Sequence, residues 1–289
     1  DGFRWAEGPV AEPSSGDILF SDVPENTVYR WNKTQGLTVY LQPSGYTGLY
    51  PQNNLQEGAN GLIFNADNKL VLAQHGDRRL AVLQDASGEL PRYQTLGSHY
   101  QGKLLNSPND LVQHRSGAYY FTDPPYGLKD GDNSAQKQQS VNGIYRLSTD
   151  GTVTLLADNL TRPNGLAFSP DGQWLYVANS DPAAAQWWRY AVNDDGSLAK
   201  GELFFAMLNR HQDSMQVMTY RPGATARRFL LETDAAYVES EREFSFLADG
   251  RLVWASERSG FTHYYLYSDD GSKSAPITSG AYDVTTFYG

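Results

Sequence analysis

Short apolar runs separated by polar turn residues make up most of this chain. Five such runs occupy residues 17–21, 69–73, 118–122, 173–178 and 251–256. The last four follow Asp-Asn, Ser-Gly or Asp-Gly, which are hairpin signals because Gly accepts a positive φ at little cost. No eleven-residue window shows sustained helical periodicity. The pattern therefore predicts an all-β chain with very little helix.

A short phrase recurs at the start of several of these strand groups. It reads Glu-Gly-Pro-Val at 7–10, Ala-Asn-Gly-Leu at 59–62, Pro-Asn-Asp-Leu at 108–111 and Pro-Asn-Gly-Leu at 163–166. A repeat of about fifty residues made of strands and turns is typical of a β-propeller. Further strands at 142–147 and 152–157 give a blade of four strands. The first strand of a blade lines the central channel, so the polar residues of the phrase are expected to face one another.

The repeat is regular through four predicted blades and then changes. These blades occupy about 1–50, 51–100, 101–157 and 158–206, with a surface loop at 129–142. Residues 207–243 hold only two or three strands, among them 215–220 and 227–232, which indicates a shortened fifth blade or a seam. A further blade at about 236–279 makes six, and residues 281–288 would close the ring. The alternative is a five-bladed ring in which 207–235 complete blade four.

Composition narrows the class of protein. The 289 residues are 40% hydrophobic and 13% aromatic, enough for a sizeable core. A formal charge of −10 argues against a nucleic-acid partner, and the absence of cysteine excludes disulfides and thiolate zinc sites. No apolar run is long enough to span a membrane, so we expect no membrane partner. We also expect a monomer, and, because the chain begins at Asp1 without a leader, a trimmed or processed product.

The repeated phrase supplies candidate metal ligands. Glu7, Asn109 and Asn164 stand in repeat register, and Ca²⁺ takes six to eight hard oxygen ligands from carboxylates, amides and water. One or two carboxylates with amide oxygens on a propeller axis would suit Ca²⁺, and other divalent metals are alternatives. A second interpretation is that each Asn only forms a turn.

Residues 1–206 resemble the SMP-30/gluconolactonase/luciferin-regenerating family. The resemblance lies in these segments, in this order: 6–10 (AEGPV), 60–62 (NGL), 74–79 (QHGDRR), 105–111 (LNSPNDL), 121–127 (FTDPPYG) and 162–172 (RPNGLAFSPDG). It implies a calcium site that includes Glu7, Asn109 and Asn164. The family's further Asp corresponds to Asp213, which lies in repeat register but beyond the resembling segment, so that an exposed hairpin residue is an equal alternative. Without Asp213 the site would bind calcium far more weakly.

The same resemblance implies contacts with a lactone substrate. Asn60, His75, Arg79 and Asn109 are the candidate substrate-binding residues. For His75, a structural role at a strand end is an equal alternative. Ca²⁺ would stabilise the oxyanion as water adds to the lactone carbonyl, and Asp213 or else Glu7 would act as the general base. Asp110 and Asp123 are expected instead to orient strands through backbone hydrogen bonds.

Residues 207–289 resemble the β-propeller of dipeptidyl peptidase IV-type enzymes. The resemblance is strongest at 246–261 (FLADGRLVWASERSGF) and at 266–271 (LYSDDG). The chain has no Gly-x-Ser-x-Gly nucleophile turn, so no peptidase activity is expected. Two propeller families meeting near residue 206 indicate an engineered chimera of two propeller fragments.

Three functional hypotheses follow. The leading one is an engineered chimeric propeller scaffold that retains a gluconolactonase-like calcium site without a biological substrate. The alternative is a calcium-dependent lactonase that hydrolyses a sugar lactone by metal-assisted attack of water. A protein-interaction propeller is a third hypothesis, which rests on fold analogy alone.

Overall fold

The structure is a computed structural model of the 289-residue chain. It describes residues 2–51, 56–184, 186–208, 214–220, 227–233, 244–247, 249, 251–268 and 271–285. The chain comprises two compact units. The first unit comprises Asp1–Leu166 and Ala178–Ala185, and the second comprises Ala167–Val177 and Gln186–Gly289.

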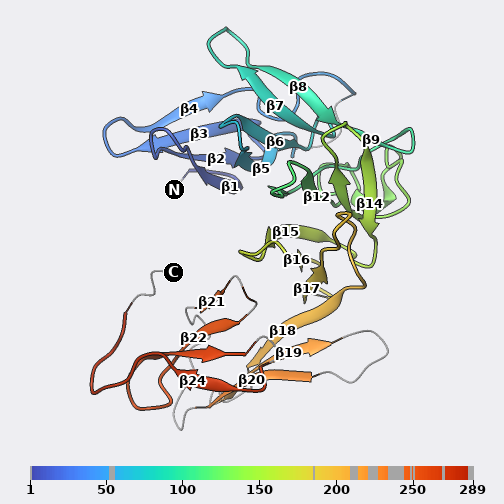
Figure 1. Ribbon diagram of the computed structural model, residues 1–289. Helices are drawn as coiled ribbons and strands as arrows, with labels where there is room; N and C mark the ends of the chain where they lie inside the picture. The colour runs from blue at the N-terminus through green and yellow to red at the C-terminus, as the bar shows by residue number, and fades with distance from the viewer. Residues whose placement is uncertain are drawn as a thin grey trace. The chain divides into compact units, whose positions relative to one another are not determined.

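The first unit contains three four-stranded antiparallel sheets in which strands adjacent in sequence are hydrogen-bonded neighbours (Figure 1). The first sheet is formed by β1 (Ala6–Ala11), β2 (Ile18–Asp22), β3 (Thr27–Asn32) and β4 (Gly36–Leu41). The second is formed by β5 (Ala59–Phe64), β6 (Leu70–Gln74), β7 (Arg79–Asp85) and β8 (Arg92–Gly97). The third is formed by β11 (Leu111–Gln113), β12 (Tyr119–Asp123), β13 (Gly143–Leu147) and β14 (Val153–Ala157).

Shorter elements connect the second and third sheets and the strands of the third. β9 (His99–Tyr100) and β10 (Lys103–Leu104) form a two-stranded hairpin. The predicted loop at 129–142 joins β12 to β13 and includes a 3-10 turn at Gly131–Asn133, the only helical segment in the described part of the chain. The all-β prediction is therefore confirmed. The described residues include no helix that is long and apolar enough to cross a membrane.

The alternation of strand side chains explains how the sheets pack. Every residue of β6 is buried, because the strand has a neighbouring sheet on each face. Leu70 and Leu72 belong to the core cluster shared with the first sheet. Val71 and Ala73 belong to the cluster shared with the third sheet. Burying one such large aliphatic side chain stabilises the fold by about 1.5–3 kcal/mol, so β6 contributes to two sheet-to-sheet interfaces.

In the first and third sheets, an acidic side chain at the end of the second strand accepts hydrogen bonds from the backbone just before the first strand. Asp22 accepts hydrogen bonds from the backbone N–H groups of Arg4 and Trp5, both at 3.1 Å. Asp123 accepts them from Asn106 at 2.7 Å and Ser107 at 2.8 Å. The prediction that Asp123 orients backbone is confirmed. Buried backbone donors require partners, so these side chains fix where the innermost strands begin.

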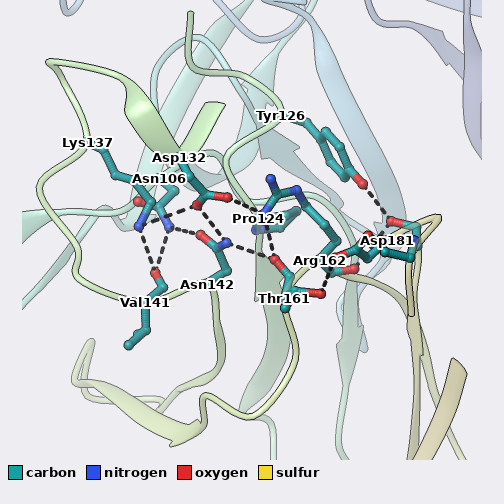
Figure 2. Close-up of polar contacts among 12 residues, drawn as sticks. Asn106, Pro124, Tyr126, Asp132, Lys137, Val141, Asn142, Thr161, Arg162 and Asp181 are labelled. Carbon is teal, nitrogen blue, oxygen red and sulfur yellow. Dashed lines mark hydrogen bonds and ion pairs between the residues drawn. The ribbon is translucent and has the colours of Figure 1, made fainter. Parts of the chain in front are cut away.

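The loop at 129–142 is held by side-chain contacts close to the start of the fourth repeat (Figure 2). The Asn142 side-chain amide donates to the Asp132 carboxylate at 2.9 Å and to the Thr161 carbonyl at 2.8 Å. Asp132 also forms an ion pair with Arg162. Lys137 Nζ donates to the Gln139 carbonyl at 2.7 Å. The predicted surface loop is thus tied to residues that precede Asn164.

The strands after residue 163 belong to two further sheets. A six-stranded sheet has the order β15-β16-β17-β18-β19-β20, and a four-stranded sheet has the order β21-β22-β23-β24. The strands are β15 (Pro163–Phe168), β16 (Trp174–Asn179), β17 (Gln186–Ala191), β18 (Glu202–Leu208), β19 (Ser214–Tyr220), β20 (Arg227–Thr233), β21 (Phe244–Phe246), β22 (Leu252–Ser256), β23 (His263–Tyr267) and β24 (Ser274–Pro276). In the second unit, buried residues of β19, β20, β22 and β23 form one apolar cluster.

Two details of the predicted propeller differ in the structure. β18 pairs with β17, β19 (214–220) pairs with β18, and β20 (227–233) pairs with β19. These strands therefore extend the fourth sheet and do not start a separate fifth one. This is the arrangement of the five-bladed alternative, and the number of blades stays a prediction. Residues 281–285 lie in no strand, and the rest of the predicted closing strand lies outside the described residues.

The close approach of β1 to β5 gives a stability prediction. Gly8 has a φ of +56°, and a Cβ atom on it would lie 2.3 Å from the Asn60 carbonyl oxygen. Gly8→Ala is expected to lower the free energy of unfolding by about 3 kcal/mol or more, because backbone strain and a backbone clash add. Urea denaturation measures this change.

A matched control separates the two causes. Gly16 has a φ of +72° with nothing within 4 Å of an added Cβ. Gly16→Ala should therefore cost only about 1 kcal/mol. If both variants lose the same free energy of unfolding, the close approach of Gly8 to the Asn60 carbonyl oxygen does not add to the cost of the substitution.

Candidate functional site

The four repeat residues lie at or just before the start of the innermost strands. Glu7 is in β1, Asn60 is in β5, Asn109 precedes β11 by two residues, and Asn164 is in β15. All four are in the first unit. Glu7 and Asn164 are half-buried, whereas Asn60 and Asn109 are 7% and 3% exposed.

The repeated phrase also marks a local irregularity of the strands. The pairing of β1 with β2 shifts register between Glu7 and Val10, and the pairing of β5 with β6 shifts between Ala59 and Leu62. Such shifts redirect side chains and are common next to functional sites. The first phrase contains Gly8 and the second contains Gly61, and glycine permits this backbone path.

Hydrogen bonds join the second, third and fourth phrases, and Ser21, which pairs with Glu7 in the first sheet, joins that sheet to the second phrase. The Gly61 N–H donates to the Asn109 carbonyl at 2.7 Å. The Ser21 hydroxyl donates to the Asn60 carbonyl at 3.0 Å, and the Thr122 hydroxyl donates to the Asn164 carbonyl at 2.8 Å. The structure therefore brings the four phrases into one connected set, in the order of the chain.

Asp110 links the third and fourth phrases and adds a second carboxylate. It accepts the N–H of Leu111 at 2.9 Å and that of Leu166 at 3.1 Å, which confirms its predicted orienting role. Burial and, to a smaller extent, the Glu7 carboxylate raise the pKa of Asp110 to about 6, against the opposing effect of these two N–H groups. Glu7 and Asp110 are therefore close enough for the charge of one to affect the ionisation of the other.

The repeat phrases carry carboxylate and amide oxygens, which suit a hard cation such as Ca²⁺. They come from Glu7, Asn60, Asn109, Asp110 and Asn164. Within the described ranges, no three His, Cys, Asp or Glu side chains gather closely enough to hold a metal ion by themselves. A cation at this place would therefore depend on the amides as well as on Glu7. The fourth predicted ligand, Asp213, lies outside the described residues.

Two contacts of the candidate ligands were not singled out from the sequence. The Trp5 indole N–H donates to Glu7 Oε1 at 2.6 Å. Trp5 precedes Glu7 by two residues, directly before β1, and this spacing was the available signal. The Asn164 side-chain amide donates to the Ser180 hydroxyl at 3.2 Å. No local pattern marks Ser180, which lies directly after β16.

The structure places the other predicted substrate residues in buried surroundings. His75 is fully buried, and burial lowers its pKa to about 4, with the Gln56 backbone acting in the opposite direction. The Arg79 guanidinium donates to Gln74 at 2.6 Å, to Thr95 at 2.8 Å and to Asp77 at 2.8 Å. These contacts fix Arg79 within the second sheet, and its role toward a substrate stays a prediction.

The fold is of the β-propeller type, and the carboxylate and amide residues of the repeat phrases lie in or next to the first strands of its sheets. Comparison with known proteins gives its family. The family model described as SMP-30/Gluconolactonase/LRE-like region matches residues 5–221. The chain belongs to this family. A second model, the dipeptidyl peptidase IV N-terminal region, matches residues 197–289. The two matches overlap across the predicted junction near residue 206, and both predicted resemblances are confirmed.

Individual relatives agree with this assignment. The gluconolactonase of Zymomonas mobilis is 41% identical over 67% of this chain and 54% of its own length. A lactonohydrolase of Aspergillus oryzae is 34% identical over 62% of this chain and 41% of its own. The chain thus spans about half the length of the curated relatives it matches. The solved structure of a gluconolactonase from Xanthomonas campestris superposes with a TM-score of 0.58 at 26% identity, covering 93% of this chain and 74% of that one.

The burial of His75 gives a prediction for the pH dependence of stability. Its pKa of about 4 in the folded state lies below the unfolded value of 6.5. Between these values the unfolded chain binds more protons, so the free energy of unfolding falls as the pH falls. From pH 7 to pH 5 this loss should amount to about 2 kcal/mol, and His75→Gln should remove it.

Urea denaturation at several pH values checks this expectation, with His99→Gln as the control because His99 is exposed. The control should keep the pH slope of the parent chain. If His75→Gln keeps the same slope as well, the buried neutral imidazole is not the cause.

Proposed function

We propose that this chain is a divalent-cation-dependent lactonase that hydrolyses a sugar lactone, with Ca²⁺ as the preferred cation. The observation that carries the proposal is the connected set of repeat phrases, which places Glu7, Asn109 and Asn164 at neighbouring innermost strands of the first unit. Membership of the SMP-30/gluconolactonase family and the gluconolactonase relatives support the same activity.

The residues that would hold the cation are Glu7, Asn109, Asn164 and Asp213. When bound, the cation supplies a Lewis acid that polarises the lactone carbonyl and stabilises the developing oxyanion. The charge arrangement suits this role, because Glu7 and the buried Asp110 carry like charges that a cation would compensate.

The protein side chains perform the remaining tasks. Asp213, or else Glu7, accepts a proton from the attacking water, whose oxygen bonds to the carbonyl carbon. The bond between the carbonyl carbon and the ring oxygen then breaks, and the ring oxygen takes up the proton held by that carboxylate, which regenerates the base and releases a hydroxy acid. Asn60, His75, Arg79 and Asn109 bind the substrate in this proposal. Trp5 restricts Glu7 by its hydrogen bond to one carboxylate oxygen.

The comparisons favour the lactonase over the scaffold hypothesis. The family match extends to residue 221, beyond the predicted junction, and three relatives are described as gluconolactonase or lactonohydrolase. The origin of the chain as an engineered chimera stays a prediction. The segment that matches the dipeptidyl peptidase IV region carries no nucleophile turn, and we propose no peptidase activity for it.

Glu7→Gln tests the site directly. The substitution removes a carboxylate and keeps the size of the side chain, so Ca²⁺ affinity should fall by about tenfold or more and hydrolysis of a sugar δ-lactone by about 100-fold or more. Isothermal titration calorimetry and a pH-stat assay measure the two quantities. Glu89→Gln, which removes an exposed carboxylate, should behave like the parent chain. A parent chain that neither binds Ca²⁺ nor hydrolyses the lactone contradicts the proposal and leaves the scaffold hypothesis.

Asp213→Asn tests whether Asp213 is the fourth ligand of the cation. If Asp213 is a ligand, removing its charge should weaken Ca²⁺ binding by about tenfold or more, because affinity depends on the number of charged ligands. Calorimetry of this variant beside the parent chain gives the answer. An unchanged affinity would show that Asp213 is not a ligand.

A further inference from the structure

Two hydrogen bonds fix the side-chain amide of Asn164. Its Oδ1 accepts the Gly165 N–H at 2.9 Å, and its Nδ2 donates to the Ser180 hydroxyl at 3.2 Å. A backbone N–H can only donate, so the amide end that faces Gly165 is the oxygen. The oxygen retains a second lone pair, and the plane of the amide is set by Gly165 on one side and Ser180 on the other.

Ser180 has two further hydrogen-bond partners. Its hydroxyl lies 3.3 Å from the Arg162 carbonyl and 2.8 Å from the Tyr126 hydroxyl, and in the second contact either oxygen can be the donor. Figure 2 shows the Tyr126 hydroxyl directed toward the segment that carries Asp181. Ser180 is thus held in place by two partners besides Asn164.

The backbone on both sides of this contact is itself anchored. The Ser180 N–H donates to the Arg162 carbonyl at 2.9 Å, and the Arg162 N–H donates to Asn179 Oδ1 at 2.7 Å. On the other side, Gly127 next to Tyr126 donates its N–H to the buried Ser107 hydroxyl at 2.8 Å. The Ser180 and Tyr126 hydroxyls therefore lie on segments whose backbone is held by hydrogen bonds.

We propose that Ser180 is a positioning residue that keeps Asn164 Oδ1 oriented as a cation ligand, and that the Tyr126 hydroxyl supports Ser180 in this task. The inference rests on the proposed cation site and adds to it two residues that do not touch the cation. Side chains that orient ligands in this way change metal affinity by about 10–100-fold when they are removed. Because Ser180 is exposed to competing water, the lower end of that range is expected here.

The test compares Ser180→Ala, Ser180→Thr and Tyr126→Phe with the parent chain by calorimetric titration with Ca²⁺. Ser180→Ala should weaken binding about tenfold, Tyr126→Phe should weaken it less, and Ser180→Thr should restore it because the hydroxyl is kept. The thermal unfolding midpoint without Ca²⁺ should stay the same in all variants. Ser87→Ala, which removes an exposed hydrogen-bonded hydroxyl between β7 and β8, is the control and should not change affinity.

A second readout does not require the cation. The side-chain amide of Asn164, assigned by NMR through its loss in Asn164→Asp, should be rigid in the parent chain and mobile in Ser180→Ala. An amide that is equally rigid in both overturns the positioning role. If the parent chain binds Ca²⁺ and Ser180→Ala binds it with the same affinity, the positioning role is also overturned, while the proposed function stands. A parent chain that binds no Ca²⁺ contradicts the proposed function and the inference together.

Discussion

Buried hydrogen bonds from neighbouring strands hold the beginning of each innermost strand in the first unit. Asp22 and Asp123 accept backbone N–H groups of their own sheets, and the hydroxyls of Ser21 and Thr122 donate to carbonyls of the next sheet. Apolar packing presses the sheets together but is not directional. The polar contacts add direction, because a buried donor or acceptor without its partner is costly. The positions of Glu7, Asn109 and Asn164 depend on them.

The same constraint produces a site with an electrostatic cost. Asp110 binds two N–H groups of adjacent repeat phrases, and its burial near the Glu7 carboxylate raises its pKa. Two carboxylates in partly buried surroundings disfavour each other's charge. A positively charged partner would be favoured here, because it would offset the repulsion between the two carboxylates. The structural role of Asp110 and the proposed chemistry of Glu7 are therefore connected through the fold.

Much of the first unit could be predicted from the sequence, since short-range rules govern its hairpins. Period-two alternation and the turn signals located β2, β6 and β12 of this unit to within a residue or two at each end, and they did the same for β16 and β22 outside it or across its boundary. The second unit was harder to predict. Whether β18–β20 begin a new sheet or extend the fourth one depends on pairing between strands, which the hydrophobic pattern does not encode.

The sequence by itself determined the strand pattern, the repeat of about fifty residues and the register that carries Glu7, Asn109 and Asn164, because these follow from periodicity along one chain. Only the tertiary structure decided which groups surround them. Tyr126 and Ser180 meet across 54 residues of sequence, and no local pattern marks such a contact. The physical reason is that side-chain hydrogen bonds between sheets are selected by proximity in space, which exists only after the sheets have packed.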